Sequence, residues 1–196
     1  MIEHAIIGAG GFGREIKAAI GIPDIKFFVD DKYEDLNNNI LGLSKFDPKK
    51  YIVIVAVGDP KDRFDIIERL PKETKYFTFI DPSAIIMDEN IQIGEGSIIC
   101  AGNIITTNVK IGKHAHLNLQ TTIGHDCKIG DYFTTAPGVK ISGNCKINDY
   151  VYIGTNASVK EKISIHSFTT IGMNAAVVKD ITERGTYVGV PAKKIK

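Results

Sequence analysis

The second half of the chain repeats a large aliphatic residue at every sixth position, and this period restricts the possible fold more than any other feature. Between residues 93 and 177, fourteen of the fifteen positions in the series hold Ile, Leu or Val. The series consists of Ile93, Ile99, Ile105, Ile111, Leu117, Ile123, Ile129, Thr135, Ile141, Ile147, Ile153, Val159, Ile165, Ile171 and Val177. An amphipathic helix repeats about every 3.6 positions, so this period is typical of stacked structural repeats instead.

A period of six predicts a triangular prism of short parallel strands. Each six-residue unit forms one flat side and one corner, three units close one coil, and successive coils stack about 4.8 Å apart. Residues 18 positions apart then lie above one another in internal ladders, such as Val109, Cys127, Cys145, Ile163 and Ile181. Cys127 and Cys145 are therefore expected to fill the core rather than to bind a metal or act as nucleophiles.

The first 80 residues lack this period and alternate between strand-like and helix-like segments. Apolar runs typical of strands cover residues 5–7, 25–29, 51–57 and 76–80. The first helix is expected to end near Gly21, and a second to begin at Asp59 and Pro60 and end at Pro71. The segment between residues 35 and 50 is expected to form an irregular loop.

These patterns predict two domains: a Rossmann-like α/β domain with a parallel sheet over residues 1–80, and a parallel β-helix over residues 81–196 that ends in a short tail. The formal net charge of +1 gives no reason to expect nucleic acid as a partner. No secretory signal is expected, because Glu3 places an acid at the N-terminus and the glycines from Gly8 to Gly13 interrupt any apolar core. No membrane segment is expected, because no apolar run reaches about 20 residues. Three cysteines, an odd number, suit a reducing compartment, so we expect a cytoplasmic protein.

A glycine-rich turn follows the first predicted strand. Gly8, Gly10 and Gly13 have the spacing of a dinucleotide fingerprint, and Asp30 lies 17 residues beyond Gly13. A nicotinamide site normally spans two βαβαβ halves, and only about 80 residues precede the repeats. The helix N-terminus after the turn offers backbone amides to a diphosphate, which favours a nucleotide-sugar over NAD. A purely structural turn is the other alternative.

Several motifs together resemble one family of proteins. They are Gly8-Ala9-Gly10-Gly11-Phe12-Gly13, Phe28-Val29-Asp30-Asp31, Ala56-Val57-Gly58-Asp59, Ile123-Gly124-His125-Asp126-Cys127-Lys128-Ile129-Gly130 and Val188-Gly189-Val190-Pro191-Ala192-Lys193. With the hexapeptide period, they resemble the left-handed β-helix acetyltransferases that N-acetylate nucleotide-sugars in bacillosamine and perosamine synthesis, which belong to glycan biosynthesis. Sialic-acid O-acetyltransferases are relatives of that family. The resemblance covers essentially the whole chain.

The resemblance implies a homotrimeric enzyme that transfers the acetyl group of acetyl-CoA to an amino group on a nucleotide-linked sugar, without a metal. Its site residues map onto this sequence by motif. The general base and the carboxylate beside it map to His125 and Asp126. Residues expected at acetyl-CoA are Thr134, Gly143, Thr155 and Met173. Residues expected at the nucleotide-sugar are Gly10, Gly11, Phe12, Asp30, Asp31, Gly58 and Asn118.

Two positions depart from the family pattern. Family members often have a second histidine nine residues after the base, where this chain has Thr134, so the contacts to the thioester are expected to differ. Relatives also frequently place a histidine in the glycine-rich turn, where this chain has Phe12, which leaves the identity of the nucleotide-sugar open.

His125 has the chemistry that acyl transfer needs. It follows Ile123 by two places, so its side chain is expected to point outward at a corner, with Gly143 one coil above it and an open slot for a pantetheine arm between coils. A histidine removes a proton from an attacking amine or hydroxyl near neutral pH. The alternative is that His125 is a solvated turn residue without a catalytic role. His114 and His116 are expected on the surface or at an interface.

Other functions fit the same fold. Acetylation of a sugar hydroxyl would use the same base. A carbonic-anhydrase version of the prism needs three converging histidines, and the spacing of His114, His116 and His125 does not resemble that family's. A non-catalytic or NAD-binding β-helix protein is the remaining alternative.

Overall fold

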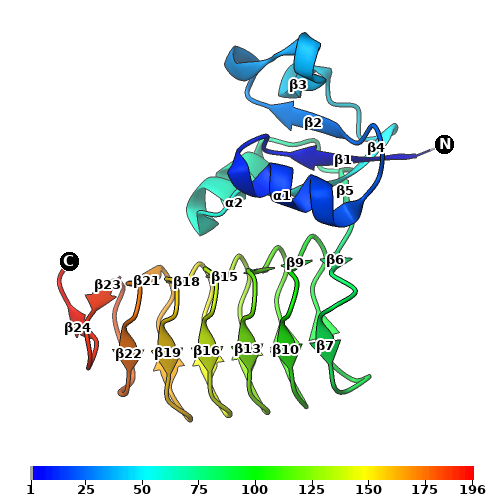
Figure 1. Cartoon of the computed structure of the whole chain (residues 1–196). Helices are drawn as coiled ribbons and strands as arrows, with labels where there is room; N and C mark the ends of the chain where they lie inside the picture. The colour runs from blue at the N-terminus through cyan, green and yellow to red at the C-terminus, as the bar shows by residue number, and fades with distance from the viewer. Residues whose placement is uncertain (1) are drawn as a thin grey trace. The chain divides into compact units, whose positions relative to one another are not determined.

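Five parallel strands form the sheet of the first unit in the computed structural model, which describes residues 2–196. They are β1 (Glu3–Ile7), β2 (Lys26–Val29), β3 (Ile40–Gly42), β4 (Tyr51–Val55) and β5 (Lys75–Tyr76), in the order β3-β2-β1-β4-β5. This is the strand order of a Rossmann-like fold, in which ligands bind outside the carboxyl ends of the strands. The predicted α/β class of the N-terminal half is confirmed (Figure 1).

Two α-helices accompany this sheet, α1 (Gly11–Ile20) and α2 (Pro60–Glu68). The helix α1 ends at Gly21, whose left-handed backbone (φ 67°) suits glycine. The side chain of Asp59 accepts hydrogen bonds from the amides of Lys61 and Asp62, which caps α2 as predicted. Short 3₁₀ turns are η1 (Asp31–Tyr33), η2 (Leu36–Asn38) and η3 (Leu43–Lys45). Among residues 2–196, neither α-helix is long and apolar enough to cross a membrane.

Two predictions for the first half were wrong. The segment expected to be an irregular loop contains the edge strand β3, because Asn39 turns the chain back in a left-handed conformation (φ 61°) and Asp35 exchanges backbone hydrogen bonds with Ile40. The strand expected at residues 76–80 is two short strands. The first is β5, and the second, β6 (Phe79–Ile80), pairs in a sheet of the β-helix.

The remaining strands build the β-helix in three parallel sheets (Figure 1). Sheet B contains β6, β9 (Ile98–Ile99), β12 (His116–Leu117), β15 (Thr134–Thr135), β18 (Tyr152–Ile153), β21 (Thr169–Ile171), β23 (Gly185–Val188) and the antiparallel β24 (Lys193–Lys194). Sheet C contains β7 (Ile85–Ile86), β10 (Ile104–Ile105), β13 (Thr122–Ile123), β16 (Lys140–Ile141), β19 (Ser158–Val159) and β22 (Ala176–Val177). Sheet D contains β8 (Gln92–Ile93), β11 (Lys110–Ile111), β14 (Lys128–Ile129), β17 (Lys146–Ile147) and β20 (Ser164–Ile165). The second unit is a left-handed parallel β-helix of hexapeptide repeats.

The six-residue series lies inside this β-helix. Residues 18 apart pair in register, as Ile111 does with Ile129 and Ile129 with Ile147. Cys127 and Cys145 are buried in the same core, as predicted. Thr135, the exception in the series, is also fully buried. Its hydroxyl accepts a hydrogen bond from the backbone amide of Asn118 and is hydrogen-bonded to the hydroxyl of Thr121. A buried hydroxyl is tolerated when it is hydrogen-bonded in this way.

The division between the two compact units falls between Phe79 and Ile80. The first unit has an aromatic core of its own, in which Phe28 makes edge-to-face contacts with Phe46 and Tyr51 at 5.3 and 5.1 Å between ring centroids. The core of the second unit is mainly aliphatic.

His114 and His116, expected on the surface or at an interface, are buried within the single chain, at 4% and 1% exposure, so the surface position was wrong. His114 begins a corner column in which the repeat places aromatic rings above one another. Its ring stacks on Tyr132 at 5.4 Å, and the column continues through Tyr150 to Phe168. This stacking explains the burial of His114, which the period of the aliphatic residues does not reveal.

Candidate active site

His125 lies at a corner of the β-helix, between β13 in sheet C and β14 in sheet D. Ile123 and Cys127 on either side point into the core, and the turn between them carries Gly124, His125 and Asp126. Asp126 adopts a left-handed conformation (φ 60°), which aspartate tolerates better than most residues. The side chains of His125 and Asp126 are 58% and 44% exposed, so both project away from the core.

His125 and Asp126 form a hydrogen-bonded dyad. Nδ1 of His125 lies 2.7 Å from Oδ2 of Asp126, and the other carboxylate oxygen accepts a 2.6 Å hydrogen bond from Nδ2 of Asn108, one coil below. The hydrogen bonds from His125 and Asn108, in that order, lower the pKa of Asp126 below its ordinary value. Because an ionised carboxylate only accepts hydrogen bonds, Nδ1 is the donor to Asp126, so in the neutral imidazole the lone pair is on Nε2.

Gly143 provides the space that the His125 ring occupies. A Cβ atom built on Gly143 would lie 2.6 Å from Nε2 of His125, and the next two nearest atoms also belong to this ring. The two coils are hydrogen-bonded to each other at this point, since the backbone amide of Asn144 donates to the His125 carbonyl at 2.7 Å. A side chain at position 143 would therefore displace the imidazole, whereas glycine allows the ring to lie here with 58% of the His125 side chain exposed.

The other residues expected at acetyl-CoA lie elsewhere on the prism. Thr155 and Met173 belong to the column of corners between sheets B and C, where Met173 is 71% exposed. Thr134 is buried on sheet B, in register with His116. Asn118, which was expected at the nucleotide-sugar, begins the corner after β12, and its side-chain oxygen accepts a hydrogen bond from the backbone amide of Leu119. Gly143 lies at the same column of corners as His125, whereas Thr155 and Met173 lie at a different one.

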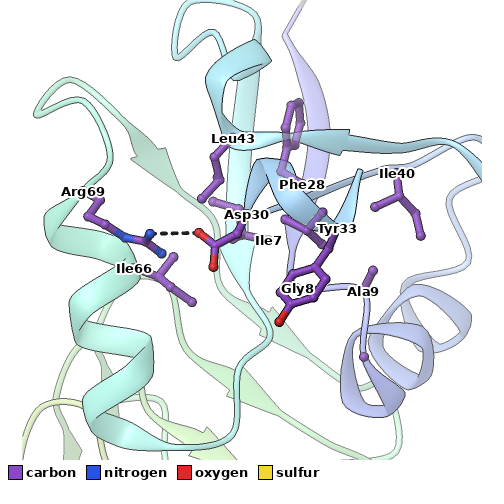
Figure 2. A pocket seen from close by; sticks show the side chains of 12 residues that line it. Ile7, Gly8, Ala9, Phe28, Asp30, Tyr33, Ile40, Leu43, Ile66 and Arg69 are labelled. Atoms are coloured by element: carbon purple, nitrogen blue, oxygen red, sulfur yellow. Dashed lines mark hydrogen bonds and ion pairs between the residues drawn. The ribbon is translucent and has the colours of Figure 1, made fainter. Parts of the chain in front are cut away.

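The first unit contains a cavity of about 340 Å³ at the carboxyl ends of β1 and β2 (Figure 2). Its walls are Ile7, Gly8, Ala9, Gly10, Phe28, Val29, Asp30, Tyr33, Ile40, Leu43, Ile66 and Arg69. Most of these side chains are apolar, and Asp30 and Arg69 are the two charged ones, joined by a 2.8 Å ion pair. A mostly apolar cleft with a few polar groups, at this edge of an α/β sheet, is typical of a small-molecule site.

The glycine-rich turn at this cavity depends on two glycines for its shape. Gly8 has φ of +104°, a conformation that L side chains rarely adopt. A Cβ atom on Gly13 would lie 1.9 Å from the Gly8 carbonyl oxygen, so the first turn of α1 packs on β1 only if residue 13 is glycine. Gly10 and Gly11 have open space around them, which leaves the N-terminus of α1 accessible to an anion.

The predicted nucleotide-sugar residues divide between several places. Gly10 and Asp30 line the 340 Å³ cavity, whereas Asp31 lines a second cavity of about 440 Å³. Of the described residues, Gly11, Phe12 and Gly58 contribute to neither wall. Sequence reasoning missed Arg69, Tyr33 and the apolar walls. Arg69 follows Asp30 by 39 positions and belongs to no motif, so the sequence carries no signal for their contact.

Comparisons with known proteins agree with this architecture. The family model for the PglD N-terminal domain matches residues 4–70. WeeI from Acinetobacter baumannii AYE is 32% identical over 100% of both chains, with a TM-score of 0.90. The acetyltransferase domain of PglB from Neisseria gonorrhoeae FA1090, solved in complex with acetyl coenzyme A, is 30% identical over 98% of both chains, with a TM-score of 0.87. The chain belongs to the PglD-like family of β-helix acetyltransferases.

A third structure has lower sequence identity to this chain and supports the fold alone. PerB from Caulobacter crescentus, solved in complex with CoA and GDP-perosamine, is 24% identical over 99% of this chain and 97% of its own, with a TM-score of 0.87. A comparison with curated protein sequences gave no match. Across residues 2–196, no three His, Cys, Asp or Glu side chains are grouped so that they could hold a metal ion.

Proposed function

We propose that this PglD-like protein transfers the acetyl group of acetyl-CoA to the amino group of a nucleotide-linked amino-deoxy sugar, with His125 as the general base. The observation that carries the proposal is the exposed His125–Asp126 dyad, whose imidazole lies against a glycine and is hydrogen-bonded to the carboxylate through Nδ1. Membership of the family supports acetyl transfer, and a relative 30% identical to this chain was solved with acetyl coenzyme A.

In the proposed reaction, the amine nitrogen attacks the carbonyl carbon of the thioester and Nε2 of His125 accepts the proton that the amine loses. The C–S bond then breaks, the electron pair leaves with the CoA sulfur, and the proton passes from His125 to that thiolate. Asp126 stabilises the imidazolium that forms in between, as a carboxylate does in hydrolase triads. The products are an amide and free CoA, so atoms and charges balance without an acyl-enzyme.

The test is the release of CoA thiol from acetyl-CoA in the presence of UDP-, GDP- or dTDP-linked 4-amino sugars. His125→Ala is expected to reduce turnover by roughly 10²–10⁴-fold, the usual contribution of a general base. His166→Ala is the matched control, because His166 is another exposed histidine at a β-helix corner. Turnover of His125→Ala within a few-fold of the wild type would show that the base is wrongly assigned.

A sugar hydroxyl is the alternative acceptor, since the same base would activate it. Analysis of the product for an amide or an ester separates the two reactions. The apolar and charged lining of the 340 Å³ cavity and the accessible N-terminus of α1 support a nucleotide-linked acceptor, with Gly10, Gly11, Phe12, Asp30, Asp31, Gly58 and Asn118 as the proposed contacts.

We also propose that the enzyme is a homotrimer that works in the cytoplasm. His125 and Gly143 lie at the corners between sheets C and D, and Thr155 and Met173 at those between sheets B and C, so one acetyl-CoA would contact both groups only in a groove between two copies. Thr134 is the remaining proposed contact. A solution mass close to that of one 21.4 kDa chain would contradict the trimer.

A further inference from the structure

Asp30 and Arg69 are brought together from distant parts of the first unit. Asp30 follows β2 directly, and Arg69 caps the C-terminal end of α2, with Oδ1 of the one 2.8 Å from Nη1 of the other. Figure 2 shows the pair in the cavity wall, with Ile66 and Leu43 nearby. The second cavity of about 440 Å³ is lined by the same two residues. The ion pair is therefore the charged group that the two cavities share.

An acidic residue at this place has one favourable and one unfavourable effect on a nucleotide. A carboxylate at the end of the second strand can accept hydrogen bonds from ribose hydroxyls. Its negative charge also repels the diphosphate that the N-terminus of α1 would bind, by an energy that varies inversely with distance. The neighbouring Asp31 does not have this conflict, because its Oδ1 accepts a hydrogen bond from the Ser44 amide and it lies outside the 340 Å³ cavity.

Arg69 resolves the conflict at Asp30. Its guanidinium neutralises the carboxylate and fixes one oxygen, while Oδ2 of Asp30 stays available as an acceptor. We propose that Arg69 is a positioning residue for the nucleotide: it acts through Asp30, by cancelling the charge of that carboxylate, rather than by contacting a phosphate. This inference rests on the proposed nucleotide-sugar site and assigns the residue that makes an acid-containing pocket accept an anionic ligand.

A double-mutant cycle on the full-length protein tests this role. The probes are UDP, GDP and dTDP, and the one that binds most tightly to the wild type by calorimetry is carried forward with its nucleoside. Arg69→Gln is expected to weaken binding of the nucleotide by roughly 5- to 20-fold, because the carboxylate is then uncompensated. Binding of the uncharged nucleoside should change less than twofold.

The decisive variant is Asp30→Asn/Arg69→Gln. If Arg69 acts by neutralising Asp30, the Arg69→Gln substitution has little further effect once Asp30 is Asn, and the two changes are strongly non-additive. An equal loss in both backgrounds would mean a direct contact with phosphate and would overturn the inference. Lys61→Gln is the matched control, since it removes the same charge from the Lys61–Asp65 ion pair on the same helix.

Two further outcomes separate this inference from the proposed function. Wild-type protein that binds none of the three nucleotides overturns the inference whatever the acetyl-transfer assay gives. Non-additivity in the cycle without acetyl transfer to any sugar supports the inference and contradicts the proposed function. Thermal melting of each variant checks folding, and the side chains of Arg69 and Asp30 are 54% and 39% exposed, so unfolding is not expected to interfere.

Discussion

The two units of this protein bring functional residues together by different means. In the β-helix, Asn108 is hydrogen-bonded to Asp126, and Gly143 lies against the His125 ring. The members of each pair are 18 positions apart, so successive coils stack them. In the α/β unit, Asp30 follows β2 and contacts Arg69 at the C-terminal end of α2, 39 positions later, because tertiary packing brings these two ends within reach. Contacts in the first case follow from counting along the chain, and those in the second from tertiary packing alone.

The largest expected effect tests whether the two units also unfold separately. Phe28→Ala removes a fully buried ring from the aromatic core of the first unit. It is expected to lower the free energy of unfolding by about 3–5 kcal/mol, a large part of the total for a small domain. Phe133→Ala is the matched change in the β-helix, where Phe133 is equally buried. Calorimetry should show each variant lowering a different transition. A single transition that both variants lower alike would contradict independent units.

Gly143→Ala is expected to have the next largest effect, on catalysis alone. The added methyl group displaces the His125 ring, and a misplacement of this order costs roughly 10²-fold in turnover. Stability should stay within about 0.5 kcal/mol, because only a side chain has to move. The measurements are CoA release and thermal melting.

Gly124→Ala is the contrasting variant on the coil that carries His125. Its Cβ atom would lie 2.6 Å from the backbone nitrogen of Gly143, so it is expected to destabilise the β-helix by about 1–3 kcal/mol. If Gly143→Ala lost stability to the same extent, or kept full turnover, the space at Gly143 would not be what positions the His125 ring.

The same contrast explains which features could be predicted from the sequence. The period of six predicts the coils, the buried positions of Cys127 and Cys145, and the outward direction of His125, because each follows from register. It does not predict that the hydroxyl of Thr135 is satisfied inside the core, since its partners are the backbone amide of Asn118 and the hydroxyl of Thr121, and the period specifies neither contact.

In the α/β unit, local signals predicted the ends of helices but not the edge of the sheet. The cap at Asp59 and the stop at Gly21 depend on a few neighbouring residues. The strand β3 has three residues and follows an Asn-rich segment, so its pairing with β2 outweighs its weak local preference. The ion pair of Asp30 with Arg69 is of the same kind, which is why the sequence motifs gave only one of its members.

A smaller effect is expected where a local signal does determine structure. Asp59→Ala removes the side chain that caps α2 and should cost about 1 kcal/mol. The loss should appear only in the transition that Phe28→Ala lowers. Asp59→Asn is the control, because asparagine caps helices about as well as aspartate. Equal melting temperatures for the Ala and Asn variants would show that the cap contributes nothing measurable.

The smallest effect concerns the coil-to-coil contact that supports the dyad. The pKa of Asp126 lies below its ordinary value of 3.8, chiefly through His125 and secondarily through Asn108. A lowered carboxyl pKa stabilises the fold at pH values above the unfolded pKa, and this stabilisation disappears as the pH falls through the lowered value. Asn108→Gly removes one donor without backbone strain, since residue 108 has φ of 53°. The pKa of Asp126 should therefore rise toward 3.8 but stay below it, because the hydrogen bond from His125 remains. An NMR titration of the carboxyl carbon measures both values, and Asn156→Gly, at another left-handed corner position, is the control. An unchanged pKa in Asn108→Gly would mean that stacking places Asn108 beside Asp126 without supporting its charge, and the register of the β-helix would then account for the position of the dyad but not for its electrostatics.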